Sequence, residues 1–151
     1  MKTKKVIGII LGVLLSFTAI FAIIHLVTRE KVPEGALLVI QGEEKAYVLL
    51  EKLPMTKVEG TIRNGKGEEI QVEMEGVLAL EALKATKIDI SSIQFVKVVA
   101  EDEFSAEVSM EELSEPDKVY LAKEDGQMRL VVFGDDNAKR NVRDVVRLEV
   151  W

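Results

Sequence analysis

Four cations near the C-terminal end of the sequence form its most basic stretch: Lys139, Arg140, Arg143 and Arg147. An arginine guanidinium binds a phosphate or a carboxylate through two parallel hydrogen bonds, so a small anion site is chemically reasonable here. Charge runs are more often solvated faces than binding sites. The alternative interpretation is therefore that these cations pair with neighbouring carboxylates, which are Asp135, Asp136, Asp144 and Glu149.

Two acidic clusters have the right residue types for chemistry but lack the rest of a site. Glu101, Asp102 and Glu103 could supply paired carboxylates for acid–base work, yet nothing nearby in the sequence indicates burial that would shift their pKa values. Asp135-Asp136-Asn137 resembles the start of a calcium loop without its later glycine and glutamate. We expect a strand end in water at the first cluster and a polar turn at the second.

Composition excludes several classes of function. The sequence has no cysteine and one histidine, which excludes disulfides, thiolate metal sites and catalytic thiols and disfavours imidazole chemistry. The formal net charge is −6, and three of the cations lie within the first five residues. The acidic remainder argues against a nucleic-acid partner, because clustered cations supply most of the affinity for phosphate backbones.

The N-terminal part of the sequence has the pattern of a membrane anchor. Residues 1–5 are basic, and residues 6–27 form an apolar run long enough to span a bilayer as a helix. A cleaved signal peptide is the alternative, although its apolar region is usually shorter. The lysine bias places residues 1–5 in the cytoplasm. We therefore predict a single-pass protein of the cell membrane, a tether at residues 28–36 and an extracytoplasmic domain at residues 37–151.

The domain has the element order of an α+β protein. Alternating or continuous apolar residues predict strands, and Asn64-Gly65 and Asp125-Gly126 predict hairpin turns. We expect Gly76 to end one strand, a two-turn helix to begin at Val77, and a capping box of Ser109 and Glu112 to begin another helix. The predicted strands cover residues 37–41, 57–63, 70–74, 95–100, 119–122, 128–133 and 145–150, and we expect residues 95–100 to be the central strand.

These elements, taken in order, resemble the molybdopterin-binding domain of the sulfite oxidase family, especially its small stand-alone bacterial members. The resemblance implies a mixed, barrel-like β-sheet domain with short helices. Arg143 falls on the lysine of the family's closing motif, so Arg140 and Arg143 resemble contacts to the phosphate of the pterin. The segments that carry the resemblance are VIQG (39–42), YVLLEKLP (47–54), EGVLALEALK (75–84), VVAEDEFSAEVSMEEL (98–113), VYLAKEDG (119–126), MRLVVFGD (128–135) and RNVRDVVRLEV (140–150).

The departures from the family bear on function. Its enzymes bind molybdenum through a cysteine in the loop that here reads Asn64-Gly65-Lys66-Gly67, and this chain has no thiol. Three other residues of the family's motifs are also replaced. The glycine of its Asp-Gly-Tyr motif is Glu103 here, the proline after its arginine-containing strand is Phe133, and the tryptophan of its closing motif is Asn141. We therefore expect no molybdenum centre and no molybdopterin.

These observations predict a membrane-anchored binding or interaction module rather than an enzyme. Its partner would be a membrane protein or a small anionic ligand. One alternative is a molybdopterin-dependent oxidoreductase that holds the cofactor through Arg140, Arg143 and backbone contacts and uses a non-thiolate metal ligand. A second alternative is an accessory subunit of a membrane redox or transport complex.

Overall fold

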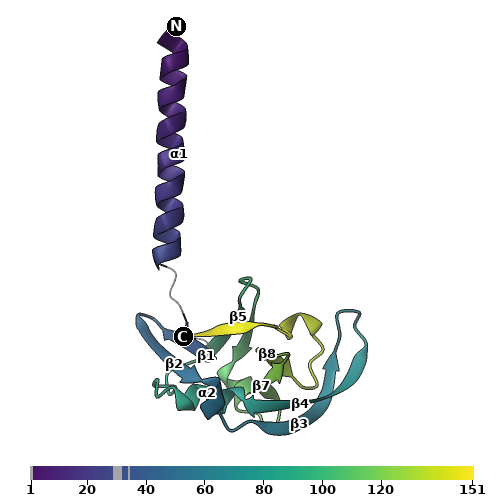
Figure 1. Ribbon diagram of the computed structural model, residues 1–151. Helices are drawn as coiled ribbons and strands as arrows, with labels where there is room; N and C mark the ends of the chain where they lie inside the picture. The colour runs from purple at the N-terminus through teal and green to yellow at the C-terminus, as the bar shows by residue number, and fades with distance from the viewer. Residues whose placement is uncertain (1, 29–31, 34) are drawn as a thin grey trace. The chain divides into compact units, whose positions relative to one another are not determined.

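The computed structural model describes residues 2–28, 32–33 and 35–151, which fall into two compact units (Figure 1). The first contains the single helix α1 (Lys2–Thr28), and the second is a domain that runs from Val32 to Trp151. Residues 1, 29–31 and 34 lie outside the described residues. They include part of the predicted tether and both cations, Arg29 and Lys31, that follow the predicted membrane span.

Helix α1 contains a segment that is long and apolar enough to cross a membrane. This segment covers Lys5–Ile24 and has a mean hydropathy of 2.8. At a rise of 1.5 Å per residue its length is about 30 Å, close to the thickness of a hydrocarbon core. The helix is therefore compatible with a transmembrane helix or signal anchor, and a signal sequence would meet the same criterion.

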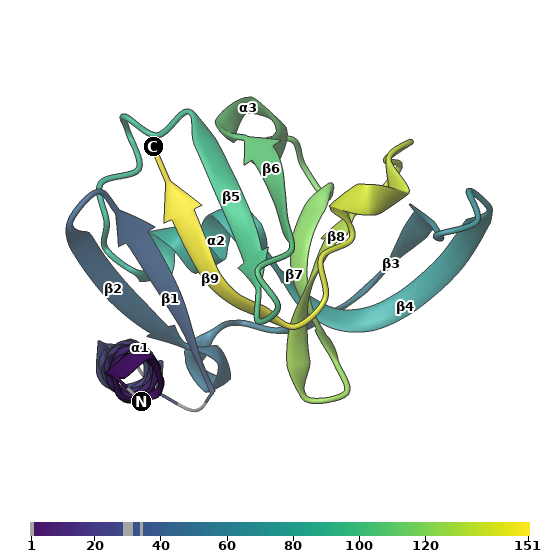
Figure 2. The same ribbon diagram turned by 90° about the horizontal axis from the view of Figure 1, so that it is seen from above.

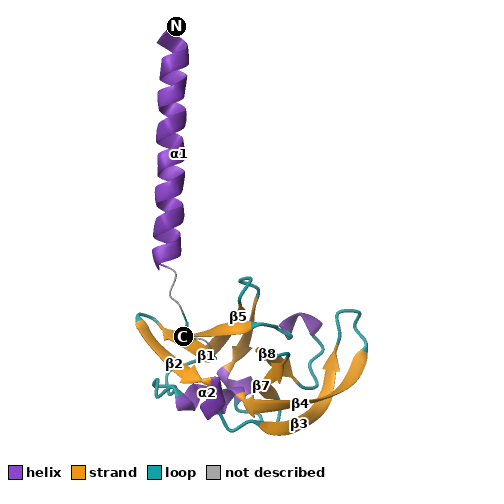
Figure 3. Ribbon diagram, viewed as in Figure 1, coloured by secondary structure: helices purple, strands orange, loops and turns teal. Residues whose placement is uncertain are grey.

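The domain is built mainly from strands, with short helices between them (Figure 3), which confirms the α+β prediction. Its helical turns are α2 (Ala79–Ala85), α3 (Met110–Leu113), η1 (Leu50–Lys52) and η2 (Ala138–Arg140). Its strands are β1 (Ala36–Gln41), β2 (Glu44–Leu49), β3 (Thr56–Arg63), β4 (Glu69–Leu78), β5 (Phe95–Ala100), β6 (Ser105–Ser109), β7 (Val119–Glu124), β8 (Gln127–Val132) and β9 (Val145–Val150).

One sheet has five strands in the order β2-β1-β9-β5-β6, visible side by side in Figure 2. β9 pairs in parallel with β1 and antiparallel with β5, so the sheet is mixed as expected. The prediction that residues 95–100 form the central strand was wrong, because β9 has that place. The continuous apolar run at residues 95–100 indicates a buried strand, and β5 is largely buried. The run does not indicate which strands pair with β5 on either side.

The other sheet has four antiparallel strands in the order β3-β4-β7-β8. Gly76 does not end β4 as predicted, and the helix begins two residues later than expected, at Ala79. At Gly76 the strand passes from pairing with β3 to pairing with β7. A Cβ atom there would lie 3.3 Å from the carbonyl oxygen of Leu121. The glycine therefore permits close approach of two backbones instead of terminating the strand.

The four-stranded sheet curls until its two outer edges meet at one end. The backbone N–H of Gly134, just after β8, donates to the carbonyl oxygen of Thr61 in β3 at 3.0 Å. The ring of Phe133 packs directly over Gly60, where an added Cβ would lie 2.5 Å from a ring carbon. This contact brings the end of β3 to the segment after β8, although β4 and β7 separate the two strands in the sheet.

The main hydrophobic core lies between the two sheets and includes one face of α2. A smaller cluster covers the other face of β7 and β8, where Ile62, Tyr120, Ala122 and Val131 are buried. Successive residues of β7 alternate between the two clusters, which explains why four in a row are buried. The smaller cluster lies beside the closed end of the four-stranded sheet.

Candidate functional site

A pocket of about 290 Å³ lies at this closed end, and three arginines line it: Arg63, Arg129 and Arg143. Arg63 is the last residue of β3, Arg129 lies in β8, and Arg143 lies between η2 and β9. Asn64 and Asn141 also line the pocket. The three guanidinium groups thus come from three parts of the chain that the curled sheet brings together. We call this site the arginine pocket.

Arg129 is the most unusual member of the pocket. Among the described residues it is the one charged residue that is buried, with 8% of its surface exposed. Its Nη1 donates to Oε1 of Glu124 at 2.8 Å, but its buried Nε has no hydrogen-bond partner among the described residues. An unpartnered donor on a buried charged group costs on the order of 1–3 kcal/mol or more. Arg129 therefore brings to the pocket lining a buried side chain with one unsatisfied donor.

Arg63 has the same combination of partnered terminal nitrogens and an unpartnered Nε. Its terminal nitrogens donate to the carbonyl oxygen of Gly67 at 3.0 Å and to the carboxylates of Glu69 and Asp136 at 3.1 and 3.3 Å. Both carboxylates are largely exposed, so their attraction for Arg63 is weakened by solvent. The Nε of Arg63 is buried and has no partner in the described part of the chain.

Arg143 lies at the open side of the pocket, with 66% of its side chain exposed. Its Nε is 3.4 Å from Oε2 of Glu124, the carboxylate that also accepts from Arg129. One carboxylate thus faces two guanidinium groups. With Glu69 and Asp136 at Arg63, three carboxylates face the three guanidinium groups, but Glu69 and Asp136 are largely exposed, so solvent weakens their compensation of the positive charge.

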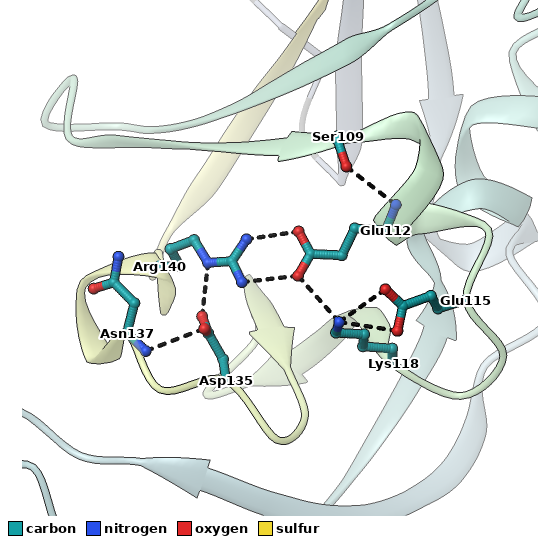
Figure 4. Close-up of polar contacts among 7 residues, drawn as sticks. All are labelled: Ser109, Glu112, Glu115, Lys118, Asp135, Asn137 and Arg140. Atoms are coloured by element: carbon teal, nitrogen blue, oxygen red, sulfur yellow. Dashed lines mark hydrogen bonds and ion pairs between the residues drawn. The ribbon is translucent and has the colours of Figure 1, made fainter.

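Arg140, which the resemblance pairs with Arg143, does not line the arginine pocket. Its guanidinium donates two hydrogen bonds to Glu112 at 2.6 and 2.8 Å, and its Nε donates to Asp135 at 2.7 Å (Figure 4). Lys118 approaches the same Glu112 carboxylate at 3.4 Å. These ion pairs tie η2 to α3, and they leave Arg140 occupied by its own carboxylates. The assignment of Arg140 and Arg143 as pterin contacts stays a prediction.

The ion-pair interpretation of the basic stretch is confirmed for two of its members. Arg140 pairs with Asp135, and Arg147 pairs with Glu149 at 2.8 Å. Arg147 also reaches Glu103 at 2.6 Å, which places Glu103 in a surface ion pair. The turn at Asp135 is polar as expected, because its carboxylate accepts from the backbone N–H of Asn137 at 3.1 Å.

The capping box is half confirmed. The hydroxyl oxygen of Ser109 accepts from the backbone N–H of Glu112 at 3.1 Å and begins α3 as predicted. The carboxylate of Glu112 is instead held by Arg140. A sequence motif four residues long cannot show a competing cation 28 positions away, and that cation forms the stronger, charge-assisted contact.

The electrostatics of Glu112 and Asp135 predict weaker folding in acid. Hydrogen bonds from Arg140 hold the pKa of Glu112 below its usual value. Burial opposes the ionised form of Asp135, but hydrogen bonds from Arg140 and the Asn137 backbone outweigh it, so its pKa is lowered too. The ionised groups therefore stabilise the folded state above their usual pKa values of 4.5 and 3.8, and this stabilisation is lost as the pH falls through the folded values.

Chemical denaturation between pH 7 and pH 3 should show this loss as a declining free energy of unfolding. The comparison is Arg140→Gln, which should decline less steeply because its two carboxylates titrate closer to their usual values. Asp89, whose pKa is lowered by its hydrogen bonds with Ser91, contributes equally to both proteins. Identical slopes for the two proteins would contradict the assignment.

A larger pocket, of about 590 Å³, lies beside η1 and is lined by apolar side chains such as Leu53 and Met128 and by the charged residues Glu51, Glu75 and Lys123. None of the unpartnered buried side-chain atoms found in the described residues belongs to it. Because all three unpartnered buried side-chain atoms in the described part of the chain belong to residues of the arginine pocket, that pocket is the better candidate for a functional site.

The loop that would carry a molybdenum ligand does not fit that role. The side-chain oxygen of Asn64 accepts from the backbone N–H groups of Lys66 and Glu68 at 2.9 and 3.0 Å, and its amide donates to the Glu68 carboxylate at 2.9 Å. The turn itself therefore uses the amide. A neutral amide also lacks the charge and softness of a thiolate. Within the described residues, no group of three or more His, Cys, Asp or Glu side chains could hold a metal ion.

Comparison with known proteins does not assign the chain to a family. A scan against models of known protein families and a search of curated protein sequences both find no significant match.

Sequence reasoning named Arg143 as a candidate site residue and named Asn64 and Asn141 as departures from the family, but it did not single out Arg63 or Arg129. Arg129 carried a usable signal, because a lone arginine interrupts an otherwise apolar strand and charged residues are rarely buried without a reason. Arg63 carried none, since a cation at a strand end is common on protein surfaces.

Proposed function

We propose that this protein is a membrane-anchored binding module whose domain binds a small anion in the arginine pocket. The observation that carries the proposal is the buried, unpartnered Nε of Arg129, a residue that lines the same pocket as Arg63 and Arg143. An anion would satisfy buried donors, and the guanidinium groups would hold it by charge-assisted hydrogen bonds. The Nε atoms of Arg63 and Arg129 are almost fully enclosed, so an anion can reach them only if the lining side chains shift.

The proposed topology places the N-terminus in the cytoplasm and the domain outside it. The support is the lysine-rich N-terminal end, followed by a helix of sufficient length and hydropathy to span a bilayer. In this arrangement α1 acts as an uncleaved, single-pass anchor. The anion-binding domain then faces ligands or a membrane protein partner on the extracytoplasmic side.

We also propose a specific type for the fold of the domain. The order of elements and the mixed five-stranded sheet support a domain of the sulfite oxidase molybdopterin-binding type. The turn chemistry of Asn64 supports a domain without molybdenum, and we propose that binding rather than oxidation or reduction is its role.

Anion binding can be tested by isothermal titration calorimetry on the full chain in detergent micelles at low salt. We expect at least one of sulfate, hydrogen phosphate, propionate and glycolate to bind. Arg129→Met should weaken binding about tenfold or more, since charge-assisted hydrogen bonds contribute about 1.5–3 kcal/mol each. Arg143→Gln should weaken it less, because Arg143 is exposed.

Lys139→Gln is the matched control, because it removes one positive charge from the same segment at an exposed side chain that does not line the pocket. It should bind as the wild-type protein does. Thermal melts establish that Arg129→Met is folded, and Arg143→Gln provides an independent measurement at a solvated position. Failure of all four anions to bind, or equal loss in Lys139→Gln and Arg143→Gln, would overturn the proposal.

A further inference from the structure

The arginine pocket contains a second kind of unpartnered atom, which bears on the class of its ligand. The side-chain oxygen of Asn141 is buried and has no hydrogen-bond partner among the described residues. Asn141 lines the same pocket as Arg63 and Arg129. The residues that line the pocket thus combine cationic donors with a neutral, unpartnered acceptor.

The orientation of the Asn141 amide follows from its contacts. Its nitrogen donates to the carbonyl oxygen of Arg63 at 3.1 Å and lies 3.4 Å from the carbonyl oxygen of Ala138. Both neighbours are acceptors, so the opposite orientation would set the side-chain oxygen against two carbonyl oxygens. The unpartnered atom is therefore the oxygen, and it can only be satisfied by a donor.

A ligand that carries only acceptors would leave this oxygen unsatisfied. Sulfate and simple carboxylates are of that kind at neutral pH, whereas hydrogen phosphate and hydroxycarboxylates carry an O–H beside the anionic oxygens.

We infer that the arginine pocket selects small anions that bear a hydrogen-bond donor next to the charged group, with the arginines holding the anion and Asn141 accepting from the donor. This inference rests on the proposed function. The pocket would discriminate against anions without a donor, because binding such an anion leaves the buried oxygen of Asn141 unpaired. Binding sites that hydrogen-bond a hydroxyl group of their ligand reject analogues without that hydroxyl for the same reason.

The test compares two matched pairs on the full chain in detergent, by calorimetry at pH 7.5. Glycolate and propionate have nearly the same shape, but glycolate has a hydroxyl group where propionate has a methyl group. Hydrogen phosphate and sulfate are both tetrahedral, and only the former carries a proton at this pH. In at least one pair we expect the donor-bearing anion to bind about tenfold or more tightly than its partner. We call this the favoured pair. It shows whether the charged group of the ligand is a carboxylate or a tetrahedral oxyanion.

Variants separate selectivity from affinity. Arg143→Gln should weaken both members of the favoured pair and leave their ratio unchanged. Asn141→Leu should reduce the ratio to about one, and a thermal melt verifies that it folds. Binding of both members with equal affinity in the wild-type protein would overturn the inference while leaving anion binding intact. Absence of any binding would overturn both the inference and the proposed function.

Discussion

Replacement of Val98 by aspartate is expected to unfold the domain. Val98 lies in β5, is 2% exposed, and belongs to the main core between the two sheets. An aspartate there would be desolvated without a partner, at a cost of several kcal/mol. That cost approaches the total stability of an ordinary domain, about 5–15 kcal/mol. The measurement is circular dichroism and thermal melting of the full chain in detergent, where the strand signal of the domain should be lost.

Val98→Ala is the control that separates charge from volume. It removes two methyl groups without introducing a charge, so the domain should remain folded and melt at a somewhat lower temperature. A Val98→Asp protein that melts within a degree or two of the wild-type protein would show that β5 does not face the core.

The second large effect is expected for Arg140→Ala. Removing this guanidinium leaves Glu112 and Asp135, whose side chains are only 15% and 11% exposed, without their main cation. Breaking a buried pair from one side costs about 3–5 kcal/mol, and the partial exposure of this network places the expected loss near 3 kcal/mol. For a domain of this size the melting temperature should fall by about 10 °C.

Two variants calibrate this result. Arg140→Lys retains the charge but not the planar fork that holds two carboxylates, so its loss should be intermediate. Arg147→Ala removes a guanidinium whose partners Glu103 and Glu149 are 67% and 29% exposed, more than the partners of Arg140, so its loss should be smaller than that of Arg140→Ala. Equal losses in Arg140→Ala and Arg147→Ala would contradict the structural role assigned to the network around Glu112.

The elements that sequence patterns predicted well are those with local causes. Asn64 closes the β3–β4 hairpin through its own side chain, and Asp125 and Gly126 both adopt the positive φ that their turn requires. Alternation over residues 57–63 and the apolar pattern over residues 145–150 each located a strand to within one residue. Such signals depend on neighbours in the chain, so they can be read without the fold.

The errors concern backbone contacts between distant segments. Gly76 was expected to stop a strand because glycine often does so, yet it lies where β4 changes partners and approaches Leu121. Residues 95–100 were expected at the centre of a sheet, although β9 takes that place by pairing with β1 and β5. Pairing depends on which strands meet, and the hydrophobic pattern of one strand does not encode its neighbours.

The candidate site also combines features that follow from local sequence with features that depend on distant segments. The sequence by itself determined the apolar N-terminal helix, the acidic domain, the lack of any thiolate ligand and the presence of a basic stretch containing Arg143. Only the tertiary structure placed Arg63 and Arg129 beside it and directed Arg140 to Glu112 instead. The physical reason is that the arginine pocket forms where the curled sheet joins the end of β3 to the segment after β8, a closure held by long-range contacts such as that between Gly134 and Thr61.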